Sequence, residues 1–124
     1  MSAKSKKRGI GLSFALQGIG QAIKKERNMK IHVAAAISAL IMGVLLKLNS
    51  IEWIVLVLVI ALVVVVEMLN TCIEVIMDLI KPEYHIMTKY IKDMAAGAVL
   101  VAAIAAAVTG LILFAPKLIE FVLL

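Results

Sequence analysis

The chain has 124 residues, of which 64% are hydrophobic, with a mean hydropathy of +1.09 and a formal net charge of +5. This composition excludes a soluble globular domain and predicts an integral membrane protein, short enough to form a single domain over residues 1–124. The single cysteine excludes an intrachain disulfide and a cysteine-based metal site. The sequence contains neither a P-loop motif nor a GxGxxG dinucleotide-binding motif.

The N-terminal part is predicted to form a short amphipathic helix at about residues 10–26. Apolar residues lie on one face and polar residues on the other, with Leu12, Ala15, Leu16, Ile19 and Ile23 opposite Ser13, Gln17, Gln21 and Lys24. A helix of this kind with a basic flank is typical of the membrane interface. Phe14 lies on the polar side, where two readings stay open: an aromatic at headgroup level, or a stacking surface for a ligand base.

Three apolar stretches follow, each close to the roughly 20 residues that span a bilayer. Their expected limits are 29–46, 51–72 and 93–115. A tight turn over 47–50 is expected between the first two. The second helix should continue beyond the membrane to about residue 79 and end before Pro82. A loop over 81–92 should then lead to the third span, and Pro116 should end that span.

The basic residues are distributed unevenly along the chain. Eleven of the thirteen lysines and arginines lie before the first span or between the second and third. The positive-inside rule therefore places the N-terminus in the cytoplasm and the C-terminus outside, in a multi-pass protein of a cell membrane. Because these residues flank apolar spans, we interpret them as topology signals and headgroup contacts, and expect no nucleic-acid partner.

The third span is rich in small residues, which allow membrane helices to approach one another closely. Three helices in a chain of this size enclose little volume. We therefore expect an oligomer, although a single crowded three-helix bundle remains the alternative at this point.

The most informative feature is a polar stripe on the second apolar helix. At 100° per residue, Glu67, Asn70, Glu74 and Asp78 fall within about 80° of one another on its surface. Glu67 lies within or at the edge of the hydrocarbon, where an ionisable group is costly and indicates a functional site by default. We expect Asp78 to be a solvated or capping carboxylate, since it lies about three turns beyond Glu67.

The stripe suggests phosphoryl-transfer chemistry when it is combined with other residues at the same depth. Burial disfavours a charged carboxylate, which suits Glu67 as a general base. Glu26 and Glu74 lie on different elements and could together hold Mg²⁺, while Lys92 could neutralise phosphate charge. From spacing alone this reading competes with a small proton-coupled transporter that uses Glu67, and with a purely structural role.

Four segments resemble the prokaryotic diacylglycerol kinase family: VEMLNTCIE at 66–74, Asp78, EYH at 83–85 and KDMAAGAVL at 92–100. The resemblance covers about residues 10–116. It implies an all-α homotrimeric bacterial membrane enzyme, with an N-terminal surface helix and three spans per chain, that transfers phosphate from ATP to a lipid. The ERNMKIH segment at 26–32 resembles the branch that phosphorylates undecaprenol, and diacylglycerol is the alternative substrate.

The resemblance also implies a role for each matching residue. Glu67 is expected to be the general base, Glu26 and Glu74 the metal and nucleotide carboxylates, and Asn70 and Gly97 the substrate-contacting positions. The positions expected to contact the nucleotide are Phe14, Glu83, Tyr84, His85, Lys92 and Asp93. The implied cofactor is Mg²⁺, with ATP as co-substrate.

Overall fold

The computed structural model describes residues 11–80 and 86–123, which form four helices and no strand. In chain order these helices are α2 (Gly11–Lys25), α3 (Arg27–Leu45), α4 (Ser50–Ile80) and α5 (Ile86–Leu123). The expected all-α class is therefore confirmed for the described part of the chain. The first helix was expected to begin at about residue 10, which lies outside the described residues.

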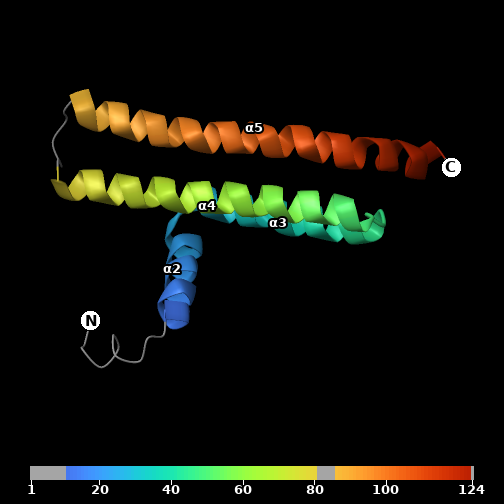
Figure 1. Ribbon diagram of the computed structural model, residues 1–124, viewed down its shortest axis with the longest axis horizontal. Helices are drawn as coiled ribbons and strands as arrows, with labels where there is room; N and C mark the ends of the chain where they lie inside the picture. Colours follow the sequence, from blue (N-terminus) through green and yellow to red (C-terminus); the bar gives the residue numbers. More distant parts are fainter. Residues whose placement is uncertain (1–10, 81–85, 124) are drawn as a thin grey trace.

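The three long helices lie side by side with α4 running opposite to α3 and α5, and α2 lies across their direction (Figure 1). Helix α4 packs chiefly against α5 and, less extensively, against α3. All three are long and apolar enough to cross a membrane. At 1.5 Å per residue, α3 is about 28 Å long and α4 about 46 Å long, so α4 extends well beyond a 30 Å hydrocarbon layer.

The turn between α3 and α4 is fixed by two local hydrogen-bond patterns. Lys47 has a φ of 56°, and its N–H and that of Leu48 donate to the carbonyls of Val44 and Gly43, which satisfies the last carbonyls of α3. Asn49 and Glu52 then cap α4 reciprocally, because each backbone N–H donates to the other residue's side chain, at 3.0 and 2.9 Å. The tight turn expected from the sequence is confirmed.

The packing at this end of the bundle depends on a close approach between α3 and α4. A Cβ added at Gly43 would lie 2.8 Å from Cη2 of Trp53, so the indole ring occupies the space that a larger residue would need. Next to this contact, a core cluster joins the turn to α4 and α5 through Leu48, Leu56, Leu113 and Phe114.

The helix that carries the third expected span is longer at both ends than the limits 93–115. Helix α5 begins at Ile86, so most of the expected loop over 81–92 is helical, and it continues through Pro116 to Leu123. Proline removes one backbone hydrogen bond, but in membrane helices neighbouring helices and local adjustments compensate. Here the segment beyond the proline is also tied to α4, because Lys117 forms a 3.2 Å ion pair with Glu52.

The buried positions of α4 form one continuous stripe. Leu56, Val63, Glu67 and Asn70 are all buried, and their spacings of seven, four and three residues place them on one face of the helix. The polar residues predicted to share a face therefore continue the apolar packing face of α4. Glu67 and Asn70 point into the bundle, and the packing of α3 and α5 on α4 determines their surroundings, whereas Glu74 is half-buried and Asp78 is exposed.

Candidate active site around Glu67

Glu67 is buried at the centre of the polar stripe. Its side chain is 2% exposed, and neither its Oε2 atom nor the buried Oδ1 atom of Asn70, one turn away, has a hydrogen-bond partner within the described residues. A buried polar atom without a partner costs about 1–3 kcal/mol. Native proteins leave few such groups, and those that remain call for an explanation such as a catalytic role. Two such atoms, one turn apart on one face of α4, indicate a binding site whose ligand supplies the missing hydrogen-bond partners.

His32 on α3 faces this carboxylate. Its Nε2 atom lies 3.8 Å from Oε2 of Glu67, and its side chain is 19% exposed. His32 is not among the residues that the sequence predicted to form the site. A signal was nevertheless present, because His32 lies three positions after Met29, on the face by which α3 packs, and is followed only by apolar residues up to Ser38.

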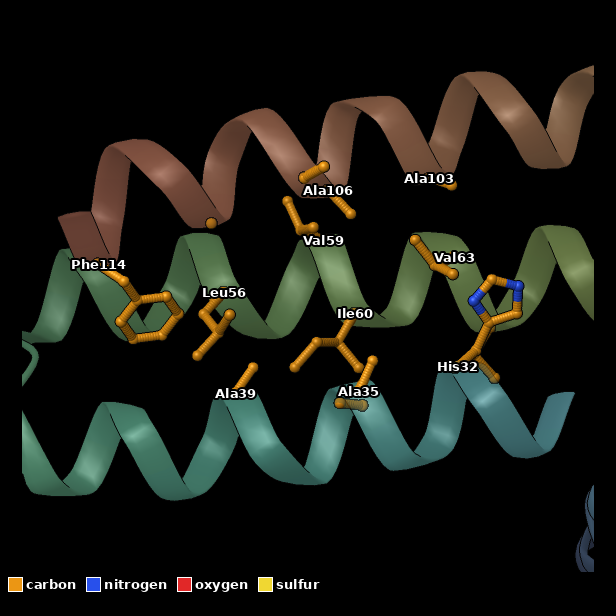
Figure 2. Close-up of a pocket in the computed structure, with 14 residues that line it drawn as sticks. His32, Ala35, Ala39, Leu56, Val59, Ile60, Val63, Ala103, Ala106 and Phe114 are labelled. Carbon is orange, nitrogen blue, oxygen red and sulfur yellow. The ribbon is translucent and has the colours of Figure 1, made fainter. Parts of the chain in front are cut away.

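An apolar cavity of about 300 Å³ lies between α3, α4 and α5 and ends at His32 (Figure 2). Figure 2 shows the imidazole at one end and the ring of Phe114 at the other. Among the described residues that line it, His32 is the one with a polar side chain, and the others are apolar and include Ala35, Ala39, Leu56, Ile60, Val63 and Ala106. The small residues of α5 therefore border a space between helices as well as close helix contacts.

Two further carboxylates act electrostatically on Glu67. The charges of Glu74, on the same stripe, and of Glu26 both repel it. Glu26 separates α2 from α3 in an extended conformation, with φ −100° and ψ 120°, and its side chain makes no capping hydrogen bond. Within residues 11–80 and 86–123, neither Glu26 nor Glu74 forms an ion pair. Glu26 and Glu74 thus lie near enough to Glu67 for their charges to act on it.

These residues suit a divalent cation only if other ligands complete the coordination. Among the described residues, no group of three or more His, Cys, Asp or Glu side chains could hold a metal by itself. Glu26 and Glu74 are half-buried, and Mg²⁺ is commonly bound by one or two carboxylates together with phosphate oxygens and water. The donor set therefore fits Mg²⁺ delivered with a nucleotide.

Lys92 has a partner that the sequence analysis did not foresee. Its Nζ atom lies 2.7 Å from Oδ1 of Asp78, and this ion pair joins the C-terminal part of α4 to the N-terminal part of α5. Asp78 is exposed, as expected, but it holds a lysine as well as facing solvent. Asp93 forms an ion pair with Lys89, one turn earlier on α5.

The remaining predicted positions are distributed along the chain. Phe14 is half-buried on α2, although it lies on the polar side of that helix. Gly97 is half-buried on α5, and a Cβ added there would meet no atom within 4 Å, so packing does not require a glycine. Glu83, Tyr84 and His85 lie outside the described residues.

Comparison with known proteins agrees with the resemblance noted from the motifs. A sequence model described as "Prokaryotic diacylglycerol kinase" matches residues 13–114. The chain is 44% identical to an undecaprenol kinase of Bacillus subtilis (strain 168) over 102 residues, which is 82% of this chain and 83% of that protein. It is 38% identical to a diacylglycerol kinase of Synechocystis over 112 residues, covering 90% of this chain and 64% of that protein.

A third relative, a diacylglycerol kinase of Escherichia coli (strain K12), is 33% identical over 100 residues, or 81% of this chain and 82% of that protein. These matches favour the kinase prediction over the transporter alternative, because the family and the relatives named here are lipid kinases. The apolar helices and the buried carboxylate thus belong to a multi-pass membrane lipid kinase that uses ATP, and the chain is a member of the prokaryotic diacylglycerol kinase family.

Proposed function

We propose that this enzyme transfers the γ-phosphoryl group of ATP to the hydroxyl of undecaprenol, with Glu67 as the general base. The observation that supports this most directly is the buried Oε2 atom, unpartnered among the described residues, beside His32 at the end of an apolar cavity. A lipid alcohol with its chain in the cavity would bring its hydroxyl to His32, next to this atom. Undecaprenol is favoured further by the 44% identical relative of that name.

In the proposed reaction, Glu67 Oε2 accepts the proton of the lipid hydroxyl as its oxygen attacks the γ-phosphorus. The bond from that phosphorus to the bridging oxygen breaks, and ADP leaves with the electron pair. Such reactions depend mainly on positioning and charge stabilisation, so few protein groups are needed. Asn70, one turn from the base, and Gly97 are proposed to contact the lipid side of the site.

Glu26 and Glu74 would hold Mg²⁺ together with the phosphates of ATP. The cation would supply positive charge to the phosphate oxygens and would offset the repulsion of Glu67 by Glu26 and Glu74. For the nucleotide we propose contacts from the positions that the family resemblance implies: Phe14, Glu83, Tyr84, His85, Lys92 and Asp93. Because Lys92 is paired with Asp78, phosphate would have to share or replace that partner.

Three further features belong to the same proposal. We place the N-terminus on the cytoplasmic side of a bacterial cell membrane, since most basic residues lie at that end of the spans. We place α2 in the interface, because it lies across the long helices and exposes Leu12, Leu16 and Ile19 (Figure 1). We also propose a homotrimer, as the family resemblance implies.

The preference for undecaprenol over diacylglycerol follows from the lining of the cavity. A polyprenol presents one primary hydroxyl and no esters, so a cavity whose one polar lining residue is His32 satisfies it. The two ester carbonyls of a diacylglycerol would need donors or lose hydrogen bonds with water. This difference predicts a specificity that can be measured.

The test is a lipid panel with purified protein in mixed micelles and labelled ATP. We expect kcat/KM for undecaprenol to exceed that for diacylglycerol by about tenfold or more, which corresponds to about 1.4 kcal/mol of differential transition-state binding. An equal or reversed ratio in the same detergent would overturn the choice of substrate and leave the lipid kinase activity standing.

The metal assignment has a separate test. Glu26→Gln and Glu74→Gln should each raise the Mg²⁺ concentration needed for half-maximal rate, because each removes one proposed ligand. Asp78→Asn is the matched control, since that carboxylate pairs with Lys92 and is not a proposed ligand. Mg²⁺ titrations of the two Gln variants that overlay the parent curve would remove both residues from the metal site.

A further inference from the structure

The distance between His32 and Glu67 leaves a specific gap. At 3.8 Å, Nε2 and Oε2 are too far apart for a hydrogen bond, for which 2.7–3.2 Å is usual. An oxygen atom placed to one side of that line would lie about 2.8 Å from both, and because Oε2 of Glu67 is fully buried, the carboxylate must turn towards the cavity to admit it. The two side chains come from different helices, so the packing of α3 on α4 sets this spacing.

We propose that His32 and Glu67 together bind the oxygen of the acceptor alcohol, with His32 Nε2–H donating a hydrogen bond to it and Glu67 Oε2 accepting its proton. The inference rests on the proposed function, because it takes Glu67 as the base and a lipid alcohol as the acceptor. It adds a substrate-binding residue, and it specifies which atom of the substrate that residue contacts.

The direction of each hydrogen bond follows from the groups available. An ionised carboxylate only accepts, so the single proton of the hydroxyl must point to Glu67. The oxygen then has two lone pairs, of which one accepts from the imidazole N–H and the other attacks the γ-phosphorus. When the new P–O bond forms, the O–H proton passes to Glu67 Oε2 and ADP leaves with the electrons of the broken P–O bond. His32 keeps its Nε2 proton throughout and serves to position the oxygen.

The cavity explains why such a pair would select a lipid alcohol. Its lining is apolar except at His32, so a hydrocarbon chain can lie in it only with a polar end group next to the imidazole. The oxygen of a primary alcohol would then meet Glu67 without further polar contacts. Water could also contact the two side chains, but it lacks the chain that would hold it there, so its reaction should be much slower.

Three substitutions at His32 separate hydrogen bonding from packing. His32→Gln retains an N–H at a reach close to that of Nε2, His32→Asn places its N–H one methylene shorter, and His32→Leu fills a similar volume without a donor. With saturating undecaprenol, we expect His32→Leu to lower kcat by about tenfold or more, since a buried oxygen loses its donor. His32→Asn should resemble it, and His32→Gln should keep kcat within about threefold of the parent. The KM for ATP should be unchanged in all three.

If the His32→Leu variant fails to fold, the kcat values of His32→Gln and His32→Asn still test whether the hydrogen bond from position 32 is needed. A normal kcat for His32→Leu would overturn the inference, and so would equal losses in the Gln and Asn variants. An undecaprenol-inactive parent, or an active Glu67→Gln variant, would instead refute the proposed function. If the parent is active, Glu67→Gln is inactive and His32→Leu is normal, then only the role of His32 is refuted.

Discussion

Replacing Glu67 by glutamine should make the enzyme inactive and at the same time more stable. Glutamine has nearly the same shape as glutamate, so the packing of this fully buried side chain is kept. It cannot accept a proton under turnover conditions, and it removes a carboxylate oxygen that has no hydrogen-bond partner in the described structure. Activity and stability should therefore change in opposite directions.

The expected magnitudes follow from these two losses. A positioned general base contributes about 10²–10⁴-fold to the rate, which is about 2.7–5.5 kcal/mol of transition-state stabilisation. We expect kcat to fall by about 10²-fold or more. Because the neutral amide is cheaper to bury than a carboxylate repelled by Glu26 and Glu74, the free energy of unfolding should rise by on the order of 1 kcal/mol.

Two measurements on the same preparation test this expectation. ATP-dependent phosphorylation of undecaprenol gives kcat, and a thermal denaturation curve in the same detergent gives Tm. Glu120→Gln makes the same chemical change at an exposed position near the end of α5, and it should alter neither quantity. Near-normal kcat in Glu67→Gln would show that this residue is not the base. An inactive variant with a lowered Tm would show that the carboxylate stabilises the fold instead.

Two other predictions concern packing and topology. Gly43→Ala should lower Tm, because the added methyl group would lie 2.8 Å from the indole ring of Trp53 and such overpacking costs about 1–3 kcal/mol. Gly18→Ala is the control and should not lower Tm, because nothing lies within 4 Å of a Cβ at that position. Equal Tm values for the two variants would contradict the close approach of α3 and α4. In a Cys72→Ala background, a membrane-impermeant thiol reagent added to intact cells should label Ser50→Cys and not Gln21→Cys, and the reverse pattern would invert the proposed orientation.

The sequence predicted the elements whose signals are local. Expected limits of 51–79 for the second long helix agree with Ser50–Ile80, because the apolar run, the turn before it and Pro82 after it are all read within a few residues. The face shared by Glu67 and Asn70 was also predictable, since helical periodicity alone places them together. The expectation that Pro116 ends the last helix was wrong, because proline is tolerated within membrane helices, where neighbouring helices and local adjustments satisfy the freed backbone groups.

Only the tertiary structure decided what lies opposite each of those faces. His32 and Glu67 are far apart in the chain, and so are Lys92 and Asp78, and no periodicity within one helix predicts that either pair meets. The cavity likewise exists because α3, α4 and α5 pack with a particular rotation and separation. A helix sequence fixes which side chains share a face, but the neighbouring helices determine which atoms that face meets. The charged residues of the candidate site could thus be selected from the sequence, while the contact of His32 with Glu67 required the packing of α3 on α4.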